Sequence, residues 1–261
     1  MKITHALSVL GLATALVGTA AEAKEWKTVR IGMDATYAPF ESVNEKGEIV
    51  GFEVDYAKAL CAKMKVTCTF QNQDWDGVIP ALLASKFDVI FSSMNETPAR
   101  AQKVLFSDVY YATAPVIMTT VANKSDDVSP AAFKGKAVGS QSSTTFSNYI
   151  QKIYPDSTYK GYPGADEPNL DLASGRLDYV VTDILVAQTF IDKSGNGCCR
   201  IITEIKRSLT PEIFGPGVGA AFRPDDKDLK DMFNKAIKEL DDDGTYKKIE
   251  AGYFKMDIRG K

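Results

Sequence analysis

Short apolar segments alternate with helical patterns along this chain, and that alternation limits the folds open to it more than any other feature. Residues 66–71 and 87–91 have the pattern of buried strands, each beside a helical segment. Residues 116–121, 136–139 and 177–183 start the series again further along the chain. Because strands separated by helices form βαβ units, the sequence predicts an α/β fold with mainly parallel sheets.

Two segments of the chain share one pattern, which favours two similar lobes. Residues 83–90 and 172–180 each run from a helix end, through small residues and one basic residue, into a strand that carries an aspartate. Both strands end in polar residues, Ser92-Ser93 in the first copy and Thr182-Asp183 in the second. Chance similarity is the alternative, but two α/β lobes facing each other across a cleft explain the repeat better.

The first residues have the pattern of a secretory signal peptide. A lysine near the start precedes an apolar run over residues 6–17, and Ala21-Glu22-Ala23 supplies small residues at a cleavage site. We therefore expect residues 1–23 to be removed and the mature protein to be exported. The single histidine, His5, would leave with this segment. The mature chain would then lack both a Ser-His-Asp mechanism and the commonest zinc ligand, so we expect no metal and no cofactor.

Four cysteines in an exported chain are read first as disulfides. Cys61 and Cys68 bracket the end of one predicted element and the start of the next, which suits a bridge between them. Cys198 and Cys199 are adjacent and follow a turn. Three states stay open for this second pair: a strained vicinal disulfide, two thiols, or an intermolecular bond.

The stretch after the strand at residues 87–91 combines several hydrogen-bond donors with one arginine. Thr97 and Pro98 are a good helix start, because a capping side chain precedes a proline in the first turn. Open α/β sheets bind ligands at this position, beyond the carboxyl ends of the strands. Arg100 offers a planar fork suited to a carboxylate. Neutral donors beside it are Ser92, Ser93 and Asn95. The alternative is a solvated surface arginine after an ordinary turn.

Further polar and aromatic residues lie at or just beyond predicted strand ends. Ser143 and Thr144 stand where another helix opens, and free amides and hydroxyls there favour an anion. The other members are Asp34, Tyr37, Trp75 and Asp183. Together these residues supply a carboxylate clamp, an ammonium partner, aromatic walls and a second acid, which suits an α-amino acid with a long polar or cationic tail. Taken singly, each has an ordinary structural role, such as core packing or helix capping.

Several motifs resemble those of the polar and basic amino-acid-binding proteins of bacterial ABC importers, above all the lysine/arginine/ornithine- and histidine-binding group. The resemblance covers essentially the whole mature chain. The motifs that carry it are residues 30–40 (RIGMDATYAPF), 51–55 (GFEVD), 74–80 (DWDGVIP), 92–93 with Arg100, 106–108 (FSD) and 242–246 (DDGTY).

The resemblance implies that the two ends of an amino-acid ligand meet different residues. The ligand carboxylate would contact Arg100, Ser93 and Thr144. The α-ammonium would contact Asp183. The ligand side chain would lie between the aromatic rings of Tyr37 and Trp75, with Asp34 and Ser92 at its polar end.

Two positions depart from the pattern of the group. Asn95 stands where serine is usual, a small change because an amide still donates and accepts hydrogen bonds. Ser140 stands where a leucine usually packs on the ligand, which opens that wall to water or to a ligand of another shape. The Cys61/Cys68 pair resembles the disulfide of the lysine/arginine/ornithine and histidine group.

The resemblance therefore implies a two-lobed periplasmic binding protein of type II. Its first lobe would comprise residues 24–112 and 213–261, and its second residues 113–212, joined by two crossings near Thr113 and Pro211. We expect a monomer that captures arginine, lysine or ornithine in the cleft, closes around it and presents it to the membrane permease of an ABC importer. The net charge of −3 argues against a nucleic-acid partner.

Two alternatives stay open. The first is histidine, glutamine or an opine-like ligand on the same scaffold, because glutamine-binding relatives also carry an aspartate at the position of Asp34. The second is a dehydratase-type enzyme on this fold, which would need a general acid in the cleft.

Overall fold

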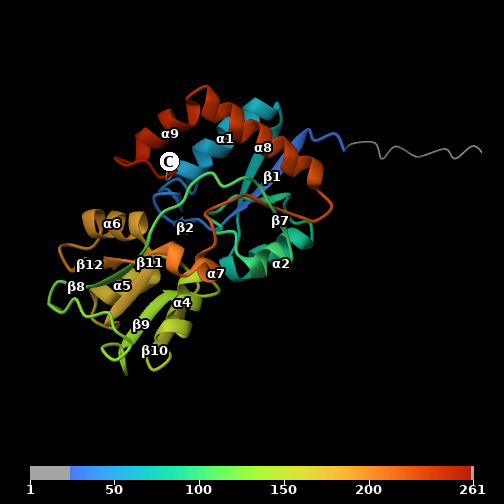
Figure 1. The fold of residues 1–261 in the computed structure, drawn as a ribbon. Coiled ribbons are helices and arrows are strands. Elements are labelled where there is room, and N and C mark those ends of the chain that lie inside the picture. The colour runs from blue at the N-terminus through green and yellow to red at the C-terminus, as the bar shows by residue number, and fades with distance from the viewer. Residues whose placement is uncertain (1–23, 260–261) are drawn as a thin grey trace, which may run out of the picture.

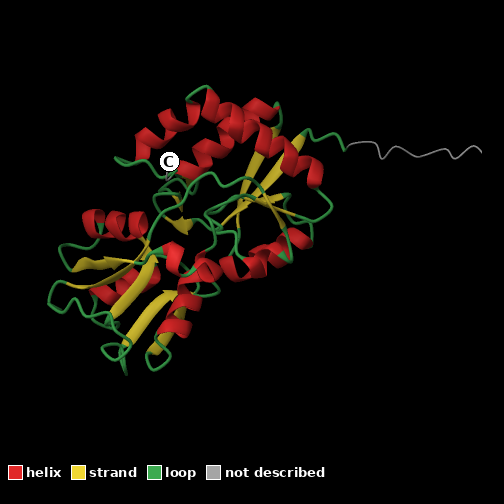
Figure 2. Ribbon diagram, viewed as in Figure 1, coloured by secondary structure: helices red, strands yellow, loops and turns green. Residues whose placement is uncertain are grey.

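The computed structural model describes residues 24–259, which fold into two α/β lobes (Figure 1). The predicted signal peptide, residues 1–23, lies outside the described residues. Each lobe is built around a five-stranded sheet that is flanked by helices (Figure 2). None of the helices in the described part of the chain is long and apolar enough to cross a bilayer.

The first sheet has the strand order β5-β1-β6-β13-β7. Its strands are β1 (Thr28–Met33), β5 (Thr67–Asn72), β6 (Val89–Ile90), β7 (Leu105–Phe106) and β13 (Ala221–Phe222). β1 runs parallel to β5 and β6, whereas β13 runs antiparallel to β6 and β7. Since β13 follows the whole second sheet in the sequence, the chain returns to its first lobe near its end.

Helices cover both faces of this sheet because neighbouring residues of a strand point to opposite sides. Val89 packs in one core with α1 and α8, and the next residue, Ile90, packs in another with α2. The helices of this lobe are α1 (Phe52–Met64), η1 (Trp75–Gly77), α2 (Val78–Leu83), α3 (Pro98–Ala101), α8 (Lys227–Asp242) and α9 (Thr245–Tyr253). A small antiparallel sheet precedes α1 and consists of β2 (Thr36–Tyr37), β3 (Glu41–Val43) and β4 (Ile49–Val50).

The second sheet has the strand order β10-β9-β11-β8-β12. Its strands are β8 (Pro115–Thr120), β9 (Ala137–Gln141), β10 (Thr158–Tyr162), β11 (Tyr179–Asp183) and β12 (Cys199–Glu204). β9 runs parallel to β10 and β11, and β8 runs antiparallel to β11 and β12. Its helices are α4 (Thr145–Ile153), α5 (Glu167–Ala173), α6 (Ile184–Lys193), η2 (Arg207–Leu209) and α7 (Pro211–Phe214). Phe214 of α7 packs in the core of this sheet, with its ring centroid 6.1 Å from that of Phe146.

The repeated sequence pattern has the same local structure in both lobes. Oδ2 of Asp88 accepts a hydrogen bond of 3.0 Å from the amide of Arg30 in the neighbouring strand, β1. Oδ2 of Asp178 accepts the equivalent bond of 2.8 Å from the amide of Ala137. Each aspartate therefore ties the beginning of its strand to the parallel strand beside it.

Two glycines occupy equivalent places next to these aspartates. A Cβ atom on Gly32 would lie 2.7 Å from the ring of Phe87, and one on Gly139 would lie 2.3 Å from a methyl carbon of Leu177. Phe87 and Leu177 are the residues directly before the two aspartates. The turn from helix to strand thus packs against its sheet in the same way in both lobes.

The two segments that connect the lobes lie side by side. The amide of Tyr110 donates to the carbonyl of Val218 at 3.0 Å, and the amide of Val218 donates to the carbonyl of Tyr111 at 2.9 Å. The loop before α3 joins them, because the amide of Glu96 donates to the carbonyl of Gly217 at 2.9 Å. This loop therefore meets both crossings.

Both cysteine pairs are bonded. The Cys61–Cys68 disulfide joins the end of α1 to β5, with Cα atoms 6.1 Å apart, and confirms the predicted bridge. Cys198 and Cys199 form a vicinal disulfide with Cα atoms 3.7 Å apart, which decides among the three states left open by the sequence.

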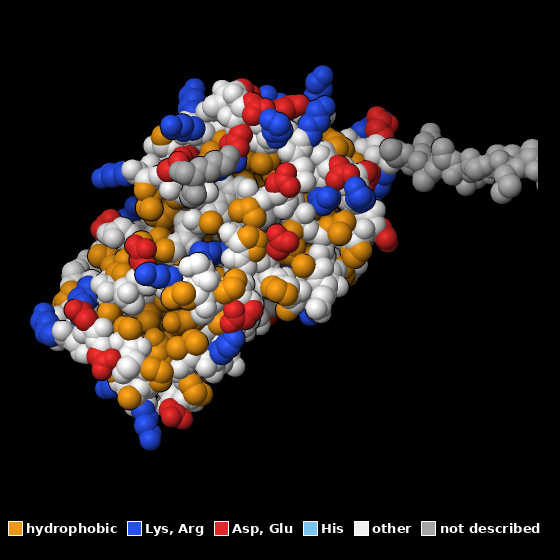
Figure 3. All heavy atoms as spheres, viewed as in Figure 1, with side chains coloured by type: hydrophobic (Ala, Val, Ile, Leu, Met, Phe, Trp, Pro, Cys, Tyr) orange, Lys and Arg blue, Asp and Glu red, His pale blue; other side chains and the backbone are white. Residues whose placement is uncertain are grey.

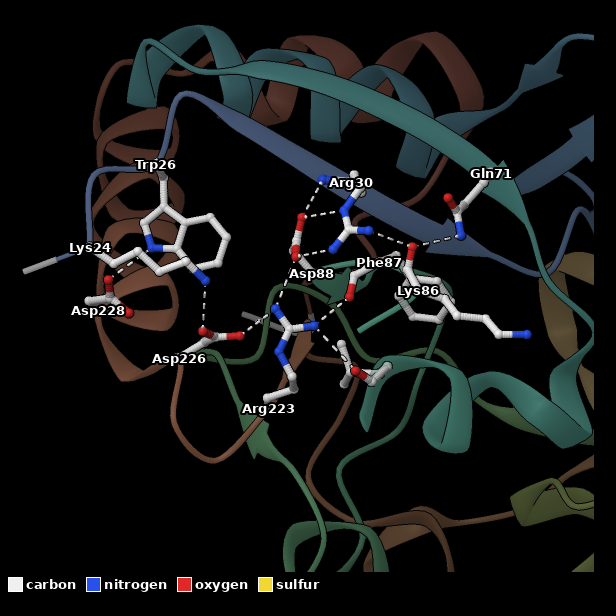
Figure 4. Close-up of polar contacts among 11 residues, drawn as sticks. Lys24, Trp26, Arg30, Gln71, Lys86, Phe87, Asp88, Arg223, Asp226 and Asp228 are labelled. Carbon is white, nitrogen blue, oxygen red and sulfur yellow. Dashed lines mark hydrogen bonds and ion pairs between the residues drawn. The ribbon is translucent and has the colours of Figure 1, made fainter. Parts of the chain in front are cut away.

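A network of charges ties three strands of the first sheet together (Figure 4). It lies at the end of the sheet opposite the loops that follow β1 and β6. Asp88 forms ion pairs of 2.8 Å with Arg30 of β1 and 2.9 Å with Arg223, which follows β13. Arg223 also pairs with Asp226 at 2.5 Å, and Lys24 reaches the same carboxylate at 3.5 Å. The first described residues are thereby held against the segment that leads into α8.

Candidate ligand-binding site

A pocket between the lobes gathers most of the residues predicted from the sequence. It encloses about 340 Å³ including its open mouth. The predicted residues that line it are Asp34, Tyr37, Trp75, Ser92, Ser93, Asn95, Arg100 and Thr144. Its wall is completed by Glu41, Gln141, Thr145 and Phe146. Residues from both lobes thus face one small space.

Arg100 supplies a positive charge to this pocket. Thr97 caps α3 by accepting a hydrogen bond of 3.3 Å from the Arg100 amide, as the sequence predicts. The guanidinium donates to the carbonyls of Asn95 at 3.0 Å and Ser143 at 3.4 Å, and lies 5.2 Å from the ring of Trp75. Burial lowers the pKa of Arg100 to about 10, so it stays charged at neutral pH. Within residues 24–259 no carboxylate forms an ion pair with it, which leaves its charge available to an anion.

Asp34 supplies a buried acid at the end of β1. Its Oδ1 accepts a hydrogen bond of 2.9 Å from Thr36, and its Oδ2 accepts one from Nε2 of Gln141 in the other lobe. Its amide donates to Ser92 Oγ at 2.9 Å. Burial raises the pKa of Asp34, and the bonds from Gln141 and Thr36 oppose that shift in part. No lysine or arginine in the described part of the chain pairs with this carboxylate.

Tyr37 and Trp75 lie where the two lobes contact each other. Tyr37 packs against the main core of the first lobe and against one core of the second. Trp75 Nε1 donates to the carbonyl of Ser143 across the cleft at 3.1 Å. Ser143 has a φ of +56°, and Ser93 in the first lobe has a φ of +50°. Such left-handed serines are uncommon, and here they turn the backbone of the two site loops.

Thr144 is the N-cap of α4 as well as part of the wall. Its Oγ1 accepts from the amide of Ser147 at 3.1 Å, and the Thr144 amide donates to Ser147 Oγ at 3.1 Å, forming a capping box. The same hydroxyl donates to the carbonyl of Gln141 at 2.8 Å. Its local contacts therefore hold the helix opening at the pocket.

Three predicted residues do not line the pocket. Ser140 is buried and donates to the carbonyl of Gln141 at 3.1 Å. The side chain of Ser143 lies outside, although its carbonyl meets Trp75 and Arg100. Asp183 caps α6 by accepting from the amide of Leu185 at 2.8 Å and also accepts from Thr113. Burial raises the pKa of Asp183 to about 6.

The pocket also holds residues that the sequence did not single out. Glu41 of β3 is fully buried and accepts from Ser92 Oγ at 2.8 Å. Gln141 ends β9 and bridges to Asp34 and to the carbonyl of Pro163, at 2.9 Å for the latter. The position of Gln141 at a strand end was a usable signal, whereas Glu41 follows Phe40 in an extended stretch with nothing to mark it.

Comparison with known proteins identifies the scaffold. Residues 29–256 match the family described as bacterial extracellular solute-binding proteins, family 3. The chain belongs to this family. Its relatives include the ABC transporter arginine-binding protein 1 of Escherichia coli, 37% identical over 94% of this chain and 98% of that protein. The L-arginine-binding protein of Pseudomonas aeruginosa is 38% identical over 98% of this chain and 95% of that protein.

Solved structures of this family have the same two-lobed fold. An ancestral arginine-binding protein bound to arginine matches with a TM-score of 0.80 and 35% identity, over 87% of this chain and 98% of that one. An ancestral arginine-binding protein bound to glutamine matches with a TM-score of 0.81 and 34% identity, over 89% of this chain and all of that one. The predicted family and fold class are thereby confirmed. Membership in this solute-binding family also places the chain among binding proteins rather than enzymes.

Proposed function

We propose that this protein captures an α-amino acid with a cationic tail in the interlobe pocket and delivers it, in the periplasm, to the membrane permease of an ABC importer. Arginine is the preferred ligand, ahead of lysine and ornithine. One observation carries the proposal: the pocket holds a charged Arg100 with no carboxylate partner together with buried Asp34 and Glu41 with no cationic partner within residues 24–259. A zwitterion with a cationic tail supplies both missing charges.

The proposed roles of the residues that line the pocket follow from their placement, and those of Asp183 and Ser140 rest on the family resemblance. Arg100, with Ser93 and Thr144, binds the ligand carboxylate through charge-assisted hydrogen bonds. Tyr37 and Trp75 enclose the tail, because a planar guanidinium stacks well on aromatic rings. The tail then meets Asp34 and Ser92. Asp183, which lies outside the pocket lining, is the partner that the family resemblance implies for the α-ammonium. Ser140 and Asn95 adjust the shape of the wall.

The proposed lobes are residues 24–112 with 213–261 and residues 113–212, although Ile213 and Phe214 at the second boundary pack in the core of the second sheet. The pairing of Tyr110 and Tyr111 with Val218 supports two adjacent crossings that act as a hinge. We propose a monomer without a nucleic-acid partner. On the visible face, acidic and basic side chains are interspersed rather than gathered by sign (Figure 3).

Glutamine is the second candidate ligand. Nε2 of Gln141 already donates to Asp34 across the cleft, so a primary amide fits the acceptor that a ligand tail would meet. A relative of known structure is bound to glutamine. A neutral tail would, however, leave both Asp34 and Glu41 without a positive partner.

Calorimetric titration of the purified mature protein with arginine, lysine, ornithine, histidine and glutamine tests the proposal. We expect arginine to bind most tightly, and at 100 times its Kd it should add about 2.7 kcal/mol to the free energy of unfolding. Bound ligand should be recovered chemically unchanged after denaturation. Tighter binding of glutamine than of all three cationic ligands, or recovery of a converted product, would contradict the proposal.

A further inference from the structure

A pair of buried acids lies directly behind the pocket wall. Glu41 of β3 and Glu53 of α1 are both completely buried, and one residue, Ser93, contacts the carboxylates of both. Glu41 also lines the pocket, whereas Glu53 lies behind it. The pair therefore connects the binding site to the interior of the first lobe.

The pair is surrounded by neutral donors. Ser92 Oγ donates to Glu41 at 2.8 Å, and Ser93 Oγ approaches its second oxygen at 3.5 Å. Glu53 accepts from the Ser93 amide at 2.8 Å and from the hydroxyl of Tyr110 at 2.7 Å. Across residues 24–259, neither carboxylate forms an ion pair with a lysine or an arginine.

Two adjacent buried carboxylates without a cation cannot both be ionised at low cost, because burial and mutual repulsion each disfavour the charged form. Burial and then the charge of Glu53 raise the pKa of Glu41 well above its usual range. Burial likewise raises the pKa of Glu53, and the bond from Tyr110 opposes that shift. The other titratable neighbours of Glu41 are Asp34, which adds negative charge, and the tyrosines at 37, 110 and 111, which stay neutral because burial raises their pKa values.

We propose that Glu41 and Glu53 share a proton in the ligand-free protein and release it when a cationic ligand tail enters the pocket. The O–H bond of the shared carboxylic acid breaks, its electron pair stays on the carboxylate, and the proton passes to the buffer base. The ligand cation then replaces the proton as the neutralising charge. Glu41 thus selects for a positive tail together with Asp34. This inference rests on the proposed function and adds the means by which the site distinguishes a charged ligand tail from a neutral one.

Proton release can be counted by calorimetry at one pH in buffers of different ionisation enthalpy. With the wild-type protein near neutral pH, arginine should release a number of protons approaching one, and glutamine should release fewer. Because the pKa of the pair falls on binding, affinity for arginine should rise with pH through the window between the free and bound pKa values. The rise is limited to about tenfold per pH unit for one proton. The Kd for glutamine should change much less.

Two isosteric variants and one control locate the proton. Glu41→Gln and Glu53→Gln should each remove the extra proton released with arginine, because either change takes away half of the pair. Glu45→Gln alters an exposed glutamate in the turn after β3 and should leave proton release as in the wild type. Persistent release in both Gln variants would assign the proton to Asp34 or Asp183 and overturn the inference.

The remaining outcomes separate this inference from the proposed function. Arginine that binds the wild type with no more proton release than glutamine overturns the inference alone. Arginine that fails to bind overturns the proposed function, and the inference with it. If neither Gln variant folds, infrared spectra of the wild-type protein decide the matter: a protonated carboxyl band should be present without ligand and lost with arginine, and its absence from the ligand-free spectrum overturns the inference.

Discussion

Arg100 is the cation on which binding of the ligand carboxylate depends. Arg100→Ala should abolish detectable binding, because a carboxylate left unpaired in a closed pocket costs about 3–5 kcal/mol. Calorimetry with arginine measures the loss. Lys103→Ala, which alters an exposed cation in the turn after α3, should leave the affinity unchanged. Near-normal affinity of the Arg100→Ala variant for any amino acid would show that this residue is not the clamp.

Asp34 tests whether the site reads the charge of the ligand tail. Asp34→Asn should weaken arginine or lysine by about 30- to 1000-fold, because the buried tail loses its counter-charge. Glutamine should lose much less, since the asparagine amide still offers an acceptor oxygen. The measurement is the ratio of variant to wild-type Kd for arginine and for glutamine. Equal ratios would show that Asp34 does not distinguish a charged from a neutral tail.

The two strand-start aspartates show how equivalent elements of the lobes differ in stability. Asp88 is buried between Arg30 and Arg223, whereas Asp178 is half-exposed and lies 3.7 Å from the exposed Lys136. Asp88→Asn should therefore lower the free energy of unfolding by about 2–3 kcal/mol, and Asp178→Asn by less than about 1 kcal/mol. Urea unfolding of both variants measures the difference. Equal losses of stability in the two variants would show that Arg30 and Arg223 contribute nothing to the stabilising effect of Asp88.

The effect of Asp88 should also depend on pH. Burial alone would raise the pKa of Asp88, but the hydrogen bonds and charge of Arg30 and Arg223 outweigh it and lower the pKa to about 2. A depressed pKa in the folded state stabilises the protein above the unfolded value near 4. The difference in stability between the wild type and Asp88→Asn should therefore hold at neutral pH and vanish between about pH 4 and pH 2. A difference that persists at pH 2 would contradict this origin.

Closure of the whole molecule rests on contacts between the lobes. Trp75 and Arg100 meet the Ser143 carbonyl, Gln141 meets Asp34, and the Ala165 amide donates to Thr36 at 3.0 Å. Saturating arginine should favour this closed arrangement and reduce the radius of gyration measured by small-angle scattering. Arg100→Ala should show no such change at the same arginine concentration. Identical wild-type curves with and without ligand would indicate a rigid pocket.

Local patterns in the sequence determined the elements and their order. The predicted strands at residues 66–71 and 177–183 appear as β5 and β11. Thr97 and Pro98 start α3 as predicted, because capping depends on neighbouring residues alone. The alternation of strands and helices also depends on local sequence patterns, and it therefore predicted the α/β class. The loops of the site, which follow strand ends, could therefore be located from the sequence.

Tertiary structure decided which side chains of those loops face the pocket. Ser140 and Gln141 are adjacent in β9, and only the second lines the wall. Neighbouring residues of a strand point to opposite faces, and a strand covered on both faces gives no apolar alternation from which to choose. Glu41 and Glu53 come together from β3 and α1 only when the small sheet packs on the helix. Contacts between residues distant in sequence leave no local signal, so only the folded chain reveals them.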